Sequence, residues 1–161
     1  MKKPALIAGI VLFSMTSCAQ PTDFSGTWVF EDQQSISGNL YSDVSPTQMK
    51  VTQKGDEIAI EKTTSAGNGD VTTNEIVTFD GKPFQTTTSS GRKKRITIKW
   101  SDDQKMLTEI TALFSTLDNG KEDYRITDRW SLENGKLVLL RKDENLIIGE
   151  VLEVKLFYDK Q

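Results

Sequence analysis

From residue 26 to the end of the chain, apolar and polar side chains alternate along a series of short segments. In one of these segments Ile96, Ile98 and Trp100 occupy every second position, with polar or charged residues between them. A period of two residues predicts strands with one buried face and one solvated face. The pattern predicts about ten strands, at residues 26–31, 47–54, 57–63, 70–79, 82–88, 92–100, 106–116, 122–132, 136–142 and 148–158.

Turn sequences separate the expected strands. Asp80-Gly81, Asn119-Gly120 and Asn134-Gly135 are typical of two-residue hairpin turns, because Asn, Asp and Gly adopt positive φ angles at low cost. Strands joined by hairpins predict an all-β fold, an antiparallel up-and-down meander of eight to ten strands. Such a meander is expected to close into a barrel, since open edges invite aggregation. The longest break, residues 32–46, is polar and long enough to lie across one end of that barrel.

The beginning of the chain has a different pattern. Lys2 and Lys3 precede nine mostly apolar residues at 5–13, a run far shorter than the roughly 20 residues that span a bilayer as a helix. This pattern predicts an export signal. The next residues, Met15-Thr16-Ser17-Cys18, resemble the lipobox of bacterial lipoproteins, in which the cysteine becomes the acylated N-terminus. The alternative is an ordinary secretory signal with an incidental cysteine.

These features divide the chain into a lipoprotein signal peptide at 1–17, a lipidated tether at 18–24 and one barrel domain at 25–161. The expected partner of the acyl chains on Cys18 is a membrane, and stable attachment needs two or more chains. Ala19 stands where lipoproteins retained in the inner membrane have Asp. The resemblance therefore implies an exported protein anchored in the outer membrane of a Gram-negative envelope.

Composition narrows the chemistry. Cys18 is the only cysteine and the chain has no histidine, so it lacks the commonest general base and the commonest transition-metal ligand. We expect no catalytic residues, no metal and no cofactor. After removal of the signal peptide, 18 basic residues face 23 acidic ones, a net charge of about −5. An acidic domain argues against nucleic-acid binding.

The first expected strand begins with Phe24-Ser25-Gly26-Thr27-Trp28, which resembles the Gly-x-Trp signature of lipocalins and fatty-acid-binding proteins, the calycin group. The segments around Gly55-Asp56, Asp80-Gly81 and Asn134-Gly135 look like successive hairpins of the ten-stranded fatty-acid-binding barrel. With its Tyr-Asp-Lys-Gln ending, the chain is also similar to uncharacterised lipocalin-like bacterial lipoproteins. The resemblance implies a lipocalin-like barrel.

Two departures from the fatty-acid-binding pattern bear on the ligand. Fatty-acid-binding proteins carry a helix-turn-helix lid after the first strand, and residues 32–46 are too short and too polar for one. They often hold the carboxylate of the ligand with an arginine two residues before a tyrosine near the C-terminus. Here Tyr158 matches the tyrosine, but Leu156 stands in place of the arginine. The carboxylate clamp is therefore missing.

Trp28 is expected to plug one end of the barrel. In the resembling families this tryptophan stacks against an arginine from a late strand, a contact worth roughly 0.5–2 kcal/mol. Arg129 and Arg141 are the two candidates for that arginine, and the sequence does not choose between them.

Four residues are candidates for ligand contacts: Tyr124, Asp128, Trp130 and Trp100. Asp128 is the most informative, because it falls on the apolar face that Tyr124 and Trp130 share. A buried carboxylate costs several kcal/mol unless it is paired. Asp128 therefore orients a polar ligand group, forms a salt bridge with an arginine, or turns outward at a bulge. Glu75 falls on the apolar face of its strand in a similar way.

Three functional classes remain. The first is a membrane-anchored lipocalin-like lipoprotein that binds a small apolar or amphipathic ligand in the cell envelope. The second is a non-enzymatic structural or protein-interaction domain with a filled barrel, no ligand and an unknown envelope protein as partner. The third, an enzyme, is disfavoured by the missing histidine. We favour the first, which follows from the resemblance, although a fold alone does not determine a function.

Overall fold

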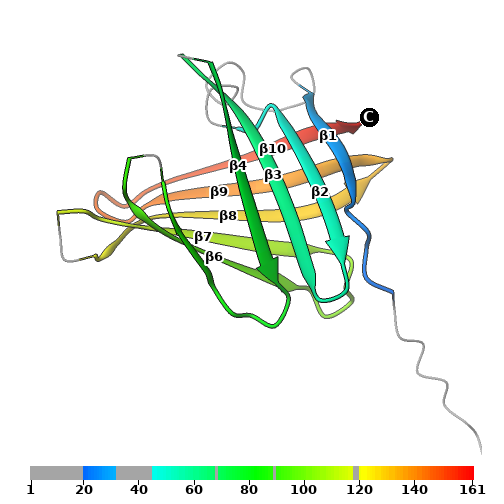
Figure 1. Cartoon of the computed structure of the whole chain (residues 1–161), viewed down its shortest axis with the longest axis horizontal. Coiled ribbons are helices and arrows are strands. Elements are labelled where there is room, and N and C mark those ends of the chain that lie inside the picture. Colours follow the sequence, from blue (N-terminus) through cyan, green and yellow to red (C-terminus); the bar gives the residue numbers. More distant parts are fainter. Residues whose placement is uncertain (1–19, 32–44, 68, 89, 118–119) are drawn as a thin grey trace, which may run out of the picture.

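Ten antiparallel strands form one continuous sheet that curls into a nearly closed barrel (Figure 1). The computed structural model describes residues 20–31, 45–67, 69–88, 90–117 and 120–161. The sheet order is β4-β3-β2-β1-β10-β9-β8-β7-β6-β5, so β4 and β5 form the two edges that approach each other. The strands are β1 (Gly26–Glu31), β2 (Gln48–Lys54), β3 (Glu57–Ala66), β4 (Gly69–Thr78), β5 (Phe84–Thr87), β6 (Lys93–Trp100), β7 (Leu107–Phe114), β8 (Glu122–Glu133), β9 (Lys136–Asn145) and β10 (Glu150–Lys160).

The predicted all-β meander is confirmed, and each of the ten expected strands overlaps an observed one. One clear difference is the start of β10. The apolar residues at 146–148 led to a predicted start at residue 148, which is too early. The backbone N–H groups of Ile147 and Ile148 donate to Oδ1 of Asn145, at 3.1 and 3.4 Å, and Gly149 has a φ of 75°. These features hold residues 146–149 in a turn, so β10 begins at Glu150.

One end of the barrel interior is filled with apolar side chains. We call it the packed end; it carries the β2–β3, β4–β5, β6–β7 and β8–β9 turns. The opposite end, which carries the β9–β10 turn at the left of Figure 1, is called the rim. The buried core cluster consists of Phe24, Trp28, Met49, Val51, Ile58, Ile60, Val77, Ile96, Ile98, Leu107, Trp130, Leu137, Leu139, Val154, Leu156 and Tyr158.

Residues just before β1 belong to this core, although they were expected in the tether. Phe24 is fully buried, and its ring stacks on Trp100 and meets Trp130 edge-on, with centroid distances of 5.8 and 5.9 Å. The carbonyl of Phe24 accepts a hydrogen bond from Nε1 of Trp28 at 2.9 Å. The backbone N–H of Thr22 donates to a carbonyl of the β6–β7 turn at 3.0 Å. The chain is therefore attached to the barrel from Thr22 onward.

Gly26 explains why the Gly-x-Trp segment needs glycine. Its φ is 148°, a conformation that L-residues rarely adopt, and a Cβ built on it would lie 2.7 Å from Cε of Lys160. The Nζ atom of Lys160 lies 5.2 Å from the centre of the Trp28 ring. Glycine at position 26 therefore leaves room for the lysine side chain that covers the tryptophan.

The cation over Trp28 is thus Lys160, and the prediction of Arg129 or Arg141 is wrong. The register between β1 and β10 places Lys160 directly opposite Trp28. Arg129 is exposed on the outside of β8, whereas the Arg141 guanidinium binds Asp128 in the barrel interior.

The described residues contain neither a membrane-spanning helix nor a cluster of metal ligands. In these ranges no helix is long and apolar enough to cross a membrane. The same ranges contain no group of three or more His, Cys, Asp or Glu side chains placed to hold a metal ion. Cys18, the signal peptide at 1–17 and residues 32–44 of the expected barrel cover lie outside the described residues.

Candidate functional site

The inner face of β8, β9 and β10 changes character from the packed end to the rim. Side chains of adjacent strands lie in rows across this face because the strands pair in regular antiparallel register. From the packed end to the rim, the rows are Trp130–Leu139–Leu156, Asp128–Arg141–Val154, Ile126–Asp143–Leu152 and Tyr124–Asn145–Glu150. An apolar floor is thus followed by a buried charged layer and then by a mixed polar and apolar rim.

The charged layer contains a two-point ion pair. Nε and Nη2 of Arg141 donate to the two carboxylate oxygens of Asp128, each at 2.8 Å. Asp128 is 3% exposed and Arg141 is 8% exposed. Burial lowers the pKa of Arg141, but the Asp128 carboxylate outweighs it and the net shift is upward. Of the alternatives for Asp128, the structure shows the salt bridge with an arginine.

A second ion-pair cluster joins β3, β4, β6 and β7 across the interior. Nζ of Lys62 lies 2.5 Å from Glu109 and 3.3 Å from Glu75, and Nζ of Lys94 also contacts Glu75. Burial raises the pKa of Glu109, and Lys62 opposes it only in part. For Glu75 the two lysines prevail over burial and lower its pKa. The middle of the barrel is therefore occupied by paired charges.

Several buried polar atoms remain unsatisfied beside these pairs. Among the described residues, no hydrogen-bond partner is found for Oε2 of Glu109, Oδ1 of Asp143, the hydroxyl of Tyr158 or Nε1 of Trp130. Burial raises the pKa of Asp143 and that of Tyr158, and Arg141 opposes both shifts. Buried polar groups are normally paired, so these atoms are exceptions to that rule.

A pocket of about 400 Å³ opens at the rim. We call it the rim pocket; it is lined by Tyr124, Asp143, Asn145, Glu150, Val151 and Leu152. Asp143 and Leu152 belong to the inner row directly beyond Arg141. The pocket therefore combines an apolar wall with carboxylate, amide and phenol groups, next to the charged layer.

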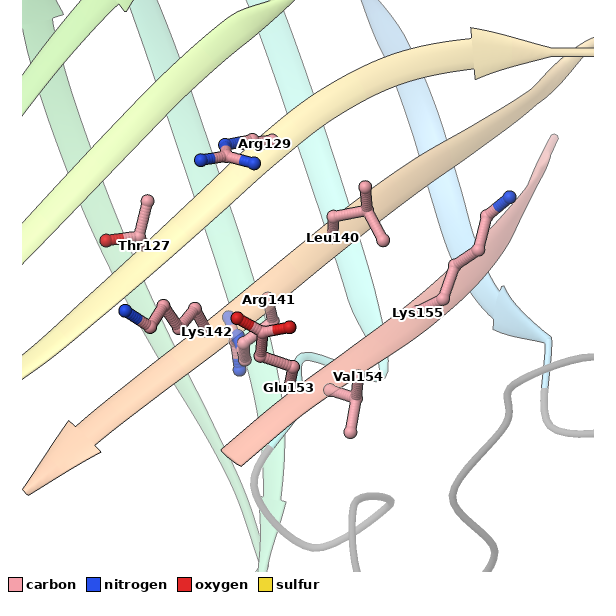
Figure 2. Close-up of a pocket in the computed structure, with 8 residues that line it drawn as sticks. All are labelled: Thr127, Arg129, Leu140, Arg141, Lys142, Glu153, Val154 and Lys155. Atoms are coloured by element: carbon pink, nitrogen blue, oxygen red, sulfur yellow. The ribbon is translucent and has the colours of Figure 1, made fainter. Parts of the chain in front are cut away.

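A second pocket, of about 300 Å³, lies over the same three strands (Figure 2). Arg129, Leu140 and Lys155 alternate along β8, β9 and β10 with the inward residues Asp128 and Arg141, so they face the outside of the barrel. Lys155 is also paired with Glu133. This hollow is therefore a groove that opens on the outer surface, and the inward residues Arg141 and Val154 also belong to its lining.

The four predicted ligand contacts lie in three different places. Trp130 and Trp100 lie at the packed end, where both touch Phe24. Asp128 lies in the charged layer, and Tyr124 lines the rim pocket. The structure therefore brings only Tyr124 of this set into a pocket, with Asp128 one layer below.

The basic run at 92–95 splits as strand alternation requires. Arg92 pairs with Asp123 and Lys94 with Glu75. Lys93 and Arg95 are exposed on the other face of β6. These four basic residues therefore do not form one patch on the surface.

Sequence reasoning missed Lys62, Glu109 and Asp143. The signal for Lys62 was present, since it continues the inward series of Ile58 and Ile60. Asp143 lies just beyond the predicted end of its strand at residue 142 and was therefore left in a loop.

Comparison with known proteins identifies the fold. No family model matches the sequence, and no curated protein is significantly similar to it. Zebrafish ileal bile acid-binding protein, in complex with cholic acid, matches with a TM-score of 0.50 and 19% identity over 86% of this chain and 98% of that chain. As-p18, an extracellular fatty acid binding protein, matches with a TM-score of 0.51 and 17% identity over 88% of this chain and 98% of that chain. The chain has the fatty-acid-binding-protein barrel fold.

The fatty-acid-binding-protein fold confirms the calycin-type barrel that the sequence resemblance implied. At these identities the likeness extends to the fold alone. In this version of the barrel Tyr158 faces inward, and the Leu156 side chain is fully buried. Arg141, on the neighbouring strand β9, is the inward arginine of this region. Its guanidinium already donates two hydrogen bonds to Asp128.

Proposed function

We propose that the barrel is a non-enzymatic binding module that holds a small amphipathic ligand in the rim pocket. The observation that carries the proposal is the pocket itself, about 400 Å³ in volume, in which the apolar side chain of Leu152 lies beside polar Asp143 in the same inner row. A few polar groups on an apolar wall, in a volume of this order, are typical of small-molecule sites. Barrels of the same fold that bind fatty acid or were solved with cholic acid support the same type of ligand.

The packed end limits how deep such a ligand reaches. Trp130, Leu139 and Leu156 fill the row below the Asp128–Arg141 pair and are almost fully buried. The ligand therefore occupies the rim half of the barrel, with its apolar part against Leu152 and the adjoining β9–β10 turn.

Mass spectrometry of an organic extract tests the proposal. The protein purified from its host envelope is expected to release a stoichiometric small molecule. Leu152→Trp fills the rim pocket and is expected to remove that molecule from the extract. Leu140→Trp is the matched control, because Leu140 and Leu152 are both 51% exposed but Leu140 faces the outer groove.

Two results would contradict this function. An empty extract from a folded, monodisperse protein would argue against any bound ligand. A ligand lost from Leu140→Trp and retained by Leu152→Trp would move the site to the outer groove.

We also propose that the barrel is anchored in the envelope by acyl chains on Cys18. Cys18 lies two residues before Gln20, and two residues of chain reach only about 7 Å. Thr22 is hydrogen-bonded to Gln104 at the packed end. An anchor attached just before Gln20 would therefore hold the barrel by its packed end, with the rim pocket directed away from the anchoring membrane.

Cell fractionation tests the anchor. The wild-type protein is expected in the outer-membrane fraction, with a mass increase at its N-terminus that matches acylation of Cys18. Cys18→Ser is expected to move to the soluble fraction, because the anchor is lost while the barrel is unchanged. An acylated protein in the inner membrane would refute the outer-membrane assignment, and an unmodified wild-type N-terminus would refute the anchor itself.

A second candidate function rests on the β9–β10 turn. Leu146, Ile147 and Ile148 are 44%, 74% and 62% exposed at consecutive positions. A contiguous exposed apolar patch is typical of a protein-interaction site. This observation favours an interaction domain with an envelope protein as partner, and an empty extract would make it the leading candidate.

A further inference from the structure

We infer that the rim pocket selects a cationic or hydrogen-bond-donating headgroup, such as an amine or an alcohol, over a carboxylate. This inference rests on the proposed binding function and goes further, because it names the chemical class of the ligand. It is also opposite to what a fatty-acid-binding barrel would suggest.

The lining of the rim pocket is acidic. Of the six residues that line the pocket, Asp143 and Glu150 are acidic and none is Lys or Arg. A carboxylate placed there would add a third negative charge to a partly buried site, where like charges repel more strongly than in water. An ammonium group would meet opposite charge.

The cations below the pocket are already paired. Arg141 binds both oxygens of Asp128, Lys62 contacts Glu75 and Glu109, and Lys94 contacts Glu75. The group of inward charges that continues from these pairs to the pocket is Lys62, Lys94 and Arg141 against Glu75, Glu109, Asp128 and Asp143. This group contains one more carboxylate than cations, and Glu150 in the next inner row adds a second.

The unsatisfied carboxylate oxygens in and below the pocket are hydrogen-bond acceptors. Asp143 lines the pocket, and its buried Oδ1 has no hydrogen-bond partner among the described residues. Deeper in the interior, Glu109 is 2% exposed and its Oε2 is likewise without a partner among them. Both are acceptors, and burial raises the pKa of both carboxyl groups. A ligand in the pocket that donates a hydrogen bond to the Asp143 carboxyl group stabilises that group, whereas an ionised carboxylate has no hydrogen to donate.

The remaining wall accommodates the rest of such a molecule. The Tyr124 ring lines the same pocket, and aromatic faces attract ammonium groups. Val151 and Leu152 also line the pocket, and the exposed apolar residues Ile147 and Ile148 lie in the β9–β10 turn at the same end of the barrel. A short alkyl chain with a donating headgroup fits both parts.

Displacement of a neutral fluorescent probe tests the inference. The full-length Cys18→Ser protein, freed of bound lipid on a hydrophobic dextran column, is loaded with N-phenyl-1-naphthylamine at pH 7. Decylamine, decanol and decanoate then compete with the probe as single molecules below their micelle concentrations. We expect decylamine to displace the probe at a concentration roughly tenfold lower than decanoate, with decanol also ahead of decanoate.

Two variants separate a local contact from the general attraction of an acidic protein for amines. Asp143→Asn is expected to remove most of the preference for decylamine over decanoate. Glu144→Gln removes the same charge from the next residue, which faces outward on β9 and pairs with Lys142, and is expected to keep the preference. Equal losses in the two variants would overturn the inference, because net charge would then explain the selectivity.

The other outcomes distinguish the headgroup preference from the proposed binding function on which it rests. Decanoate that binds as tightly as decylamine or tighter would overturn the headgroup preference and leave the binding module standing. A lipid-free, folded protein that binds neither the probe nor any of the three competitors would overturn both.

Discussion

Replacing Arg141 with methionine is expected to destabilise the barrel by about 3–5 kcal/mol, the usual cost of removing one partner of a buried ion pair. Asp128 would be left without its partner at a position that is 3% exposed, with both of its 2.8 Å hydrogen bonds from the guanidinium lost. Methionine fills much of the arginine volume, so the loss reports the charge more than a cavity. Urea unfolding followed by tryptophan fluorescence measures it.

Two further variants identify the cause of that loss. Arg129→Met removes an arginine from the outer face of β8, where the side chain is exposed, and is expected to change the free energy of unfolding by less than about 0.5 kcal/mol. The double variant Asp128→Leu with Arg141→Met removes both buried charges and is expected to recover most of the stability. A double variant as unstable as Arg141→Met would assign the loss to shape rather than to an unpaired carboxylate.

The sequence predicted the strands well because most of them have one buried and one solvated face. Ile96 and Ile98 are fully buried, and Lys99 between Ile98 and Trp100 is exposed, as the alternation required. The Asn134-Gly135 turn was equally clear, since both residues have positive φ angles of 52° and 81°. These features are local, and local patterns can be read directly from the chain.

The site could be predicted only in part. The alternation of apolar and polar residues is clear around Asp128 but not around Glu109. Asp128 stands between apolar residues two positions away on each side, so its strand assigned it to the interior. Glu109 is 2% exposed, but its neighbour Ile110 is apolar as well and points outward with 38% exposure. With apolar side chains on both faces of β7, the period of two gave no sign of which face Glu109 takes.

The partner of Trp28 shows a different limit. Lys160 covers the tryptophan because β1 pairs with β10 in a register that places the two residues opposite each other. That register joins the two ends of the domain, and no local pattern specifies it. The resemblance implied an arginine over Trp28. In this barrel a lysine from the neighbouring strand makes the cation–π contact instead.

Replacing Trp130 with alanine is expected to cost about 3–5 kcal/mol, as for other large aromatic side chains removed from a core. The Trp130 side chain is fully buried at the packed end, beside Phe24, and the surrounding strands are fixed by their pairing. The cavity left by the indole would therefore close only in part. Since a domain is stable by only about 5–15 kcal/mol, urea titration should show a large fall in the unfolding midpoint.

The same variant decides between two roles for Trp130. As a core residue it is expected to lower stability while the ligand recovered per folded molecule stays constant, because the rim pocket lies two rows away on β8 and β9. Trp130→Phe is the matched control: Nε1 has no hydrogen-bond partner among the described residues, so phenylalanine loses only packing, about 1–2 kcal/mol. Preserved stability with loss of the ligand in Trp130→Ala would instead make Trp130 a ligand contact and place the site deeper than the rim.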